Sequence, residues 1–238
     1  MKPIIDLPAE HYLDLIRNSK PFTLSRFGDG EIISMKLAPH RLKQNCDGSR
    51  FLHELVHPMR QIFKNNYDYY HCALDCTFNE HGEEFKQFIE ETCPDIQFYN
   101  GEIWQHLSFD GRITELMEAI SPYTPCFVGG YHIEYVKYMK GLESMRFIGV
   151  PERDSFLQID GIFNKIISLH KSGCRMFLFS AGFTAKPLID SLFPYIGHDT
   201  FLLDMGSCFD PYCGKLSRDG MKHHGYDFFQ PYTNLKLQ

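Results

Sequence analysis

Hydrophobic positions along the chain follow two alternating patterns. Short, nearly continuous apolar runs such as "MFLF" (176–179) and "FLL" (201–203) are typical of strands buried on both faces of a sheet. Between such runs, apolar residues recur every three or four positions, as they do in an amphipathic helix. The short runs and their flanking turn residues predict strands within 21–27, 68–74, 95–100, 125–130, 145–151, 174–182 and 199–206.

Helices are predicted between these strands. Prolines and glycines fall singly at element ends, and no repeat or flexible linker interrupts the chain. The alternation of strands and helices predicts one α/β domain over residues 1–238, with a Rossmann-like, mostly parallel sheet and helices on both faces. The expected helices lie within 8–19, 30–37, 49–63, 82–93, 131–141, 155–173 and 184–197.

Composition narrows the class of protein. With 43% hydrophobic residues the chain can bury a full core without a structural metal or disulfide. A net charge of -6 argues against a protein that binds nucleic acid or anionic membranes, although it leaves room for an anionic small substrate. No apolar run approaches the roughly 20 residues of a membrane span, and the first 20 residues lack the apolar core of a signal peptide. We therefore expect a cytoplasmic protein.

The eight cysteines are scattered and form no C-x-x-C pair. Reduced, buried thiols are the expected state in such a chain. The pairs Cys72/Cys76 and Cys208/Cys213 have the wrong spacing for a zinc knuckle.

Four predicted strands end in loops rich in polar residues and glycine. These loops are "RFGDGE" (26–31), "GVPERDSF" (149–156), "SAGFTAK" (180–186) and "DMGSCFD" (204–210). In open parallel sheets, ligands bind beyond the carboxyl ends of the strands. The fold prediction therefore places these four loops at one edge, around a common binding site.

The first of these loops contains two carboxylates separated by one glycine. Asp29 and Glu31 can approach a hard cation such as Mg²⁺ or Mn²⁺, which prefers oxygen ligands and bridges phosphates. Gly28 and Gly30 permit tight backbone turns, and Arg26 can bind a diphosphate oxygen or orient Asp29. The alternative is a helix start, with Asp29 as its cap and Glu31 near the positive end of the helix dipole.

Two later loops carry weaker signals. Ser180, Gly182 and Thr184 lie between a strand and a helix, where glycine and free N–H groups can receive a phosphate. The alternative is an ordinary turn with Thr184 as the helix N-cap. Asp204 ends the next predicted strand and Asp210 follows it, so both suit a metal or ribose contact, or simply a solvated turn.

Several motifs together resemble a known family. "SRFGDGE" resembles the D-x-E signature of the GT-D type glycosyltransferases, also catalogued as DUF1792. "GGYHIEYVKYM", "FIGVPERDSF" and "FLFSAGFTAKPLIDSLF…LLDMGSCFD" resemble later segments of that family, so the likeness spans about 22–210. Many relatives carry a proline and a histidine where this chain has Phe183 and Ser207, which leaves Asp210 or water to serve in place of that histidine.

The resemblance implies a nucleotide-sugar donor, commonly a UDP-sugar, and a divalent metal, Mn²⁺ or Mg²⁺. Carried over by position, the metal and diphosphate site comprises Asp29 and Glu31, with Asp210 as a further metal ligand. The donor-binding residues are then Arg26, Gly28, Gly30, Ser180, Gly182, Thr184 and Asp204.

Catalysis also needs a group that takes the proton of the acceptor hydroxyl, if the reaction inverts the sugar. Glu152, Asp154, His132 and Glu102 are available. Glu152 and Asp154 are favoured because they follow a predicted strand. The predicted catalytic set is therefore Asp29 and Glu31 with these two.

The predicted function is a metal-dependent glycosyltransferase of hexosyltransferase type. It would move a sugar from a nucleoside-diphosphate donor to a hydroxyl of a glycan or glycoprotein, and it could act as a homo-oligomer. A metal-dependent phosphohydrolase and a non-catalytic nucleotide-binding module are the alternatives, because the same acids and phosphate loop would serve them. Trp104 could stack on an acceptor sugar, or belong to the core.

Overall fold

The fold is built on a parallel sheet. The computed structural model describes all residues except 29, 32–34, 36–52, 218–220, 222–223 and 227–238, and only the backbone of 53, 75–76 and 78–81. Within the described residues, seven strands pair in parallel in the order β3-β2-β1-β7-β6-β4-β5. The prediction of a Rossmann-like α/β fold is confirmed. The strands are β1 (Thr23–Phe27), β2 (Tyr70–Ala73), β3 (Phe98–Asn100), β4 (Cys126–Gly129), β5 (Arg146–Gly149), β6 (Met176–Ser180) and β7 (Phe201–Asp204).

Helices connect these strands. The described α-helices are α1 (Ala9–Arg17), α3 (Val56–Asn65), α4 (Asp75–Thr92), α5 (Ile103–Phe109), α6 (Ile113–Ile120), α7 (Ile159–Lys171) and α8 (Ala185–Ile196). Short 3₁₀ turns add η1 (His53–Leu55), η2 (Ser121–Tyr123), η3 (Tyr131–Tyr138), η4 (Ser155–Gln158), η5 (Gly182–Thr184) and η6 (Asp210–Cys213). No helix in the described part of the chain is both long and apolar enough to cross a bilayer.

Three expected helices differ from the prediction. The segment 131–141 forms the 3₁₀ turn η3 instead of an α-helix, and α4 begins at Asp75, well before residue 82. In the predicted helix 30–37, Gly30, Glu31 and Met35 are helical and the other residues lie outside the described part. Helices α5 and α6 were not predicted.

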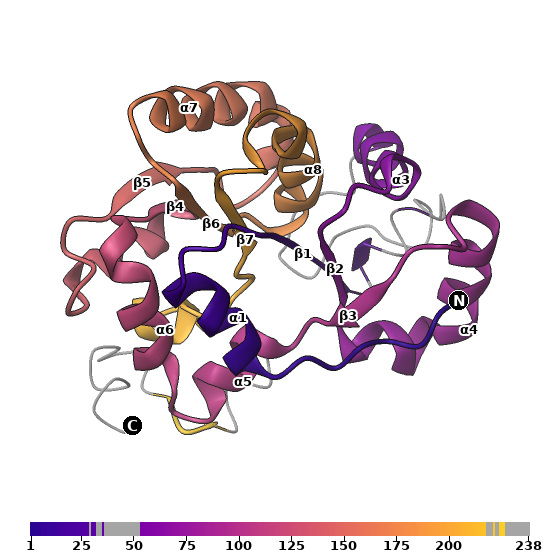
Figure 1. Cartoon of the computed structure of the whole chain (residues 1–238), viewed down its shortest axis with the longest axis horizontal. Coiled ribbons are helices and arrows are strands. Elements are labelled where there is room, and N and C mark those ends of the chain that lie inside the picture. Colours follow the sequence, from indigo (N-terminus) through magenta and orange to yellow (C-terminus); the bar gives the residue numbers. More distant parts are fainter. Residues whose placement is uncertain (29, 32–34, 36–52, 218–220, 222–223, 227–238) are drawn as a thin grey trace.

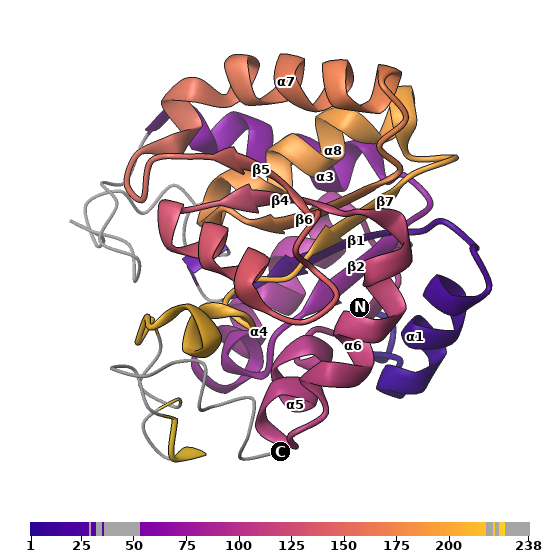
Figure 2. The same ribbon diagram turned by 90° about the vertical axis from the view of Figure 1, so that its left-hand side faces the viewer.

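The helices form two layers, one on each face of the sheet. Figure 1 shows α3, α7 and α8 on one side of the strands and α1, α5 and α6 on the other, and Figure 2 shows the same layers from the β5 edge. Strand β6 shows how the sequence creates both layers: Phe177 and Phe179 pack with the α7–α8 core, whereas Met176 and Leu178 pack with the opposite core. Successive side chains of a strand point to opposite faces, so a continuous apolar run fills two cores at once.

The two central strands come from opposite ends of the chain. Strand β1 pairs with β7, and Leu24 lies opposite Leu203. The chain after β1 leads to α3 on one face, whereas the chain after β7 leads to η6, which packs with the opposite core. Such a divergence between neighbouring parallel strands is the usual place for a ligand in an open α/β sheet.

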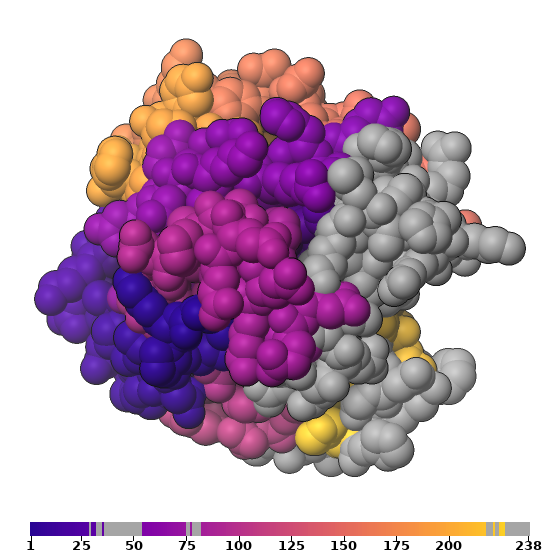
Figure 3. Space-filling model, turned by 90° about the vertical axis from the view of Figure 1, so that its right-hand side faces the viewer, coloured from indigo at the N-terminus to yellow at the C-terminus, as the bar shows by residue number. Residues whose placement is uncertain are grey.

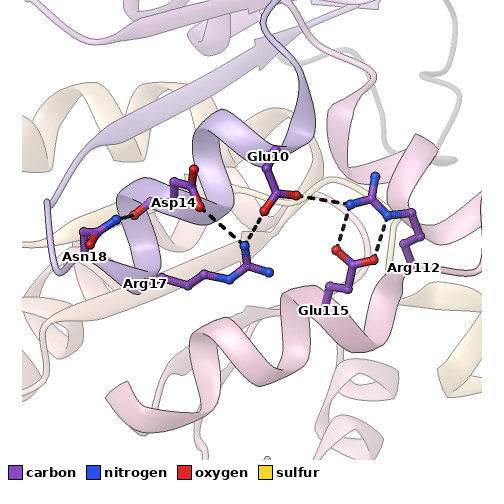
Figure 4. A network of polar contacts seen from close by, with 6 residues as sticks. All are labelled: Glu10, Asp14, Arg17, Asn18, Arg112 and Glu115. Atoms are coloured by element: carbon purple, nitrogen blue, oxygen red, sulfur yellow. Dashed lines mark hydrogen bonds and ion pairs between the residues drawn. The ribbon is translucent and has the colours of Figure 1, made fainter.

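Helix α1 is tied to α6 by a network of ion pairs on the surface (Figure 4). Glu10 contacts Arg17 on its own helix, and its second oxygen lies 3.2 Å from Arg112 Nη2. Arg112 also forms a 2.7 Å bond with Glu115. These side chains are about half exposed, so each pair contributes at most about 1 kcal/mol, and the network orients α1 more than it stabilises it.

The N-terminal segment covers the β3 edge of the sheet. Ile5 bridges in parallel to Tyr99, with Ile5 N–H donating to Phe98 C=O at 3.0 Å. The N-terminal ammonium lies 2.7 Å from Glu90 on α4, and Figure 3 shows the segment on this face of the molecule. An edge strand that is paired in this way is protected from pairing with another chain.

Buried His71 makes stability depend on pH. Burial lowers the pKa of His71 to about 4, and its Nε2–H donates to Tyr67 C=O at 3.1 Å. The unfolded histidine has a pKa of about 6.5, so the neutral folded ring contributes stability above that pH and loses it as the pH falls toward 4. We expect this residue to account for about 3 kcal/mol of the unfolding free energy lost between pH 7 and pH 4.

Urea unfolding of the wild type and of His71→Phe at both pH values tests this expectation. Phenylalanine suits the aromatic surroundings of Phe27, Phe63 and Tyr69 and cannot titrate. The variant should lose about 3 kcal/mol less than the wild type on acidification. An equal loss in both proteins would contradict the assignment.

Candidate functional site

The loops after β1 and β6 touch directly. A Cβ on Gly30 would lie 2.6 Å from Cζ of Phe183, so the phenylalanine ring packs against bare backbone. The N–H of Gly28 donates to Glu31 Oε2 at 2.9 Å, which turns the glutamate back toward the end of β1. Gly30 and Phe183 together bring two of the predicted site loops into contact.

A buried lysine lies between two carboxylates at this contact. Lys186 Nζ is 2.9 Å from Glu31 Oε1 and 3.2 Å from Asp204 Oδ2. All three side chains are nearly inaccessible, with exposures of 8%, 11% and 2% respectively. The three residues come from the β1 loop, the first turn of α8 and the end of β7. This cluster, called the Lys186 cluster below, joins three separate parts of the sequence.

The charges of the Lys186 cluster support one another. Burial by itself raises the pKa of Glu31, but the Lys186 ammonium and the Gly28 N–H outweigh it and hold that pKa below its ordinary value. Burial lowers the pKa of Lys186, and the Asp204 and Glu31 carboxylates more than reverse the effect and raise it. Glu31 and Lys186 are therefore both charged at neutral pH, and each depends on its charged partners for that state.

Arg26 is a second buried cation beside this cluster. Its backbone N–H donates to Asp204 Oδ2 at 3.2 Å, and its Nε donates to Gly101 C=O at 2.7 Å. Glu102 Oε2 lies 4.0 Å from Arg26 Nη2, and Nη2 has no hydrogen-bond partner among the described residues. A buried guanidinium nitrogen without a partner is costly, unless a ligand or water satisfies it. Arg26 is therefore suited to bind an anion.

Gly206 allows the Arg26 guanidinium to lie where it does. A Cβ at this position would lie 2.1 Å from Arg26 Nη1, and Gly206 has a φ of +55°. Gly206→Ala should displace the guanidinium and cost about 1–3 kcal/mol of unfolding free energy beyond the backbone cost of the positive φ. Gly173→Ala is the matched control, because φ there is +97° and no described atom lies within 4 Å of its Cβ. Equal losses in the two variants, measured by urea unfolding, would show that Arg26 is not held by this contact.

A second polar cluster lies at the loops after β4, β5 and β7. His132 Nε2 is 2.9 Å from Asp210 Oδ1, and His132 Nδ1 is 3.5 Å from Glu152 Oε1. Lys215 Nζ is 3.2 Å from the same oxygen of Glu152. The Glu152 side chain is 54% exposed, whereas Asp210 and His132 lie behind it at 7% and 16%. These four residues form the Glu152 cluster.

Lys215 and His132 hold Glu152 as a carboxylate. Hydrogen bonding and charge from Lys215, with a smaller contribution from His132, lower the pKa of Glu152 below its ordinary value. The loop after β7 links the two clusters, because it runs from Asp204 in the first to Asp210 in the second. The carboxyl ends of the strands therefore carry the buried cations of the Lys186 cluster and Arg26, and also the exposed carboxylate of Glu152.

Comparison with solved structures identifies the architecture. One similar structure is described as the selenomethionine form of a domain of unknown function 1792 (DUF1792), at a TM-score of 0.63 and 20% identity. Another is described as that domain with a distinct glycosyltransferase fold (0.63, 19%), and another as a new glycosyltransferase (DUF1792) from Streptococcus sanguinis (0.66, 18%). The first two comparisons cover 88% of this chain and 80% of the other, and the third covers 88% and 84%. The chain has the DUF1792 fold.

This fold is the one that "SRFGDGE" and the later motifs predicted, so the resemblance is confirmed at the level of fold. No family model and no curated protein sequence matches the chain. The DUF1792 fold is thus supported by structure, at sequence identities of 18–20%.

Within the DUF1792 fold, the predicted phosphate loop has specific partners. The hydroxyls of Thr184 and Ser155 are 2.7 Å apart, and Thr184 occupies the N-cap position of α8 without a capping hydrogen bond from its side chain. Gly182 has a φ of +55° and its C=O accepts a 3.2 Å bond from Lys186. The Ser180 hydroxyl is buried at the end of β6 and has no partner among the described residues. Gly182 therefore borders the Lys186 cluster, and Thr184 joins the β5 and β6 loops.

The predicted metal set is only partly described. Asp29 lies outside the described residues. Glu31 is bonded on both oxygens within the Lys186 cluster, and Asp210 is bonded to His132 in the other cluster. Across the described part of the chain, no group of three or more His, Cys, Asp or Glu side chains is placed to hold a metal ion. The described residues by themselves therefore do not make a metal site.

The structure also describes where the remaining candidates lie. Trp104 is completely buried and packs against Tyr12, so it belongs to the core and cannot stack on an acceptor sugar. Asp154 begins η4 in the left-handed conformation, with φ +56°, and shapes the turn after β5. The six cysteines with described side chains are buried thiols.

Sequence reasoning missed Lys186, which sits in the centre of the first cluster. One signal was present: a lysine in the first turn of a helix opposes the helix dipole. Such a residue needs a compensating carboxylate nearby, and two loops rich in acids were already predicted at the same edge.

Proposed function

We propose that the protein is a glycosyltransferase that moves a sugar from a nucleoside-diphosphate donor, with uridine as the nucleoside, to a hydroxyl of a glycan or glycoprotein. The observation that carries the proposal is the buried guanidinium nitrogen Nη2 of Arg26 beside Lys186, at the point where β1 and β7 diverge; among the described residues it has no hydrogen-bond partner, and its ion-pair contact with Glu102 is 4.0 Å long. A diphosphate is an anion of the size and charge that such a site would bind. The DUF1792 fold, shared with a protein described as a glycosyltransferase, supports the same activity.

Arg26 and Lys186 would have different tasks. Arg26 Nη2 would donate to a diphosphate oxygen of the donor and stabilise the negative charge that develops on the leaving nucleotide. Lys186 is already paired with Glu31 and Asp204. It would hold those carboxylates in place and keep the local potential from repelling the donor.

Glu152 would take the proton of the acceptor hydroxyl. The acceptor oxygen forms a bond to the anomeric carbon, the bond from that carbon to the diphosphate breaks, and the electron pair leaves with the nucleotide. The hydroxyl proton passes to the exposed Glu152 carboxylate, which His132 and Lys215 position. Asp210 contacts His132 in turn, so we propose Glu152 as the group that takes the proton and His132 as a positioning residue.

A divalent cation, Mn²⁺ or Mg²⁺, is also proposed. Its support is the Asp29-x-Glu31 pair in the sequence and the resemblance of "SRFGDGE" to a D-x-E signature. When bound, such an ion would neutralise charge on the diphosphate. The steps assigned above to Arg26 and Glu152 do not depend on it.

A thermal-shift screen of nucleotide sugars, each with and without Mn²⁺, tests the donor and the metal together. A ligand at 100 times its Kd stabilises the folded state by about 2.7 kcal/mol, which raises Tm by roughly 5–10 °C in a chain of this size. We expect a UDP-sugar to give this shift and Mn²⁺ to increase it. Binding that is identical with and without metal would contradict the cofactor proposal.

The product distinguishes the alternatives. Transfer of the sugar to an added glycan supports a glycosyltransferase, whereas release of inorganic phosphate from the nucleotide would identify a phosphohydrolase. A donor that binds and is never cleaved would point to a nucleotide-binding module.

A further inference from the structure

The 3₁₀ turn η3 places its side chains in three rows. A 3₁₀ helix has three residues per turn, so side chains three positions apart lie one above another. Ile133 and Val136 form one row and are both buried, and Met139, the residue that follows the turn, is buried as well. The same spacing puts His132, Tyr135 and Tyr138 in a second row. Because each residue rises about 2.0 Å, this second row extends about 12 Å from His132.

The tyrosines of this row are open to solvent. Tyr135 is 60% exposed and Tyr138 is 73% exposed, and their ring centroids are 5.9 Å apart. Lys137 Nζ lies 5.4 Å from the centre of the Tyr138 ring and also pairs with Glu134 at 2.8 Å. The two neighbouring rings give this surface a small apolar patch.

The row begins at the Glu152 cluster. His132, its first member, contacts both Asp210 and Glu152. Tyr131, the residue before it, packs over the end of β5, because a Cβ on Gly149 would lie 2.6 Å from the Tyr131 ring. The exposed rings therefore continue from the carboxylate that is proposed to take the acceptor proton.

We propose that Tyr135 and Tyr138 form a binding subsite for the carbohydrate chain of the acceptor. This inference rests on the proposed function. A tyrosine ring presents an apolar face that matches the C–H face of a sugar ring, and its hydroxyl can bond to sugar hydroxyls. Lys137 and Glu134 add polar partners beside the rings. A glycan lying along the row would have one end at Glu152, where its hydroxyl would react.

The position of the rings favours a sugar chain over a protein partner or a second copy of this chain. The occupant must deliver a hydroxyl to Glu152, and the row is the length of a short oligosaccharide. Tyrosine also loses little side-chain entropy when it binds, because it has only two side-chain torsions.

Binding to a printed array of oligosaccharides tests the subsite without any donor. We expect the wild-type protein to bind one class of glycan, and the double variant Tyr135→Ala/Tyr138→Ala to bind it at least about ten-fold more weakly. Tyr135→Phe/Tyr138→Phe should retain most of the affinity, because the ring faces remain. Tyr195→Ala is the matched control: this tyrosine is 72% exposed on α8 and makes a ring contact with Phe163.

Donor cleavage to water and molecular mass in solution are measured on the same proteins. Unchanged donor cleavage in the alanine double variant is expected, because the rings would contact only the acceptor. Equal glycan binding by the wild type and the double variant would overturn the inference, as would a wild type that cleaves donor and binds no glycan. A change in oligomeric state on substitution would also overturn it, since the rings would then be an interface between copies. Failure of the wild type to cleave any donor would count against the proposed function instead.

Discussion

Replacing Lys186 with methionine should lower the free energy of unfolding by about 3–5 kcal/mol and abolish donor cleavage. Methionine fills a similar volume, but it removes the ammonium that lies 2.9 Å from Glu31 and 3.2 Å from Asp204. Both carboxylates are then buried without the cation that lies between them. Urea unfolding measures the stability, and release of nucleotide from a UDP-sugar measures the cleavage.

Three further variants separate charge from packing. Lys186→Arg keeps the positive charge and should retain most of the stability. Adding Glu31→Gln to Lys186→Met removes one of the two buried carboxylates that have lost their cation, so the double variant should be more stable than Lys186→Met alone. Lys165→Met replaces an exposed lysine on α7 and should change neither stability nor cleavage. A Lys186→Met protein with wild-type stability would show that the two carboxylates do not depend on this lysine.

The large loss of stability expected for Lys186→Met follows from the burial of the Lys186 cluster. An exposed ion pair contributes little, because water and salt screen it. In the Lys186 cluster the three side chains are almost completely buried, and the neighbouring charges hold the pKa values of Glu31 and Lys186. Removing one partner from such a group leaves the full cost of an uncompensated buried charge.

The sheet could be predicted from sequence because its strands are buried on both faces. Runs such as "MFLF" and "FLL" have few other structural explanations once helices of regular period lie between them. Helix α6 carried a readable pattern as well, with Ile113, Leu116, Met117 and Ile120 all buried. In contrast, the pattern of the predicted helix 131–141 was ambiguous: Ile133, Val136 and Met139 recur every three residues, which fits one side of an α-helix or a 3₁₀ turn.

The edge of the sheet that carries the candidate site could also be predicted, because the carboxyl ends of parallel strands lie together. The partners within the site could not. His132 and Asp210 are 78 residues apart in sequence, and their contact depends on how the β4 and β7 loops pack. Lys186 meets Glu31 only because β1 lies beside β7 and α8 packs against both. For Trp104 the sequence left two possibilities open, a sugar platform or the core, and the structure buries the side chain in the core.

Glu152→Gln should reduce sugar transfer by about 10²–10⁴-fold and leave donor binding unchanged. Glutamine has the same shape as glutamate and can still contact Lys215, but it cannot accept the proton of the acceptor hydroxyl. Transfer to an acceptor glycan measures the loss, and the thermal shift given by the donor checks that binding is intact. Glu83→Gln is the matched control, because Glu83 also pairs with a lysine, Lys86, at 2.9 Å on the surface of α4. Wild-type transfer by Glu152→Gln would remove Glu152 from the mechanism.

The pH dependence of transfer gives an independent test of the same role. Hydrogen bonding and charge from Lys215 lower the pKa of Glu152, so the carboxylate remains ionised, and able to accept a proton, below the ordinary pKa of glutamate, about 4.3. The acid limb of the transfer rate should therefore lie below that pH in the wild type. Lys215→Met removes the main cause of the lowered pKa and should move the limb to higher pH, while the rate at pH 7 changes much less. If Glu152 merely held a loop in place, Lys215→Met would lower the rate equally at every pH, and the acid limb would not move.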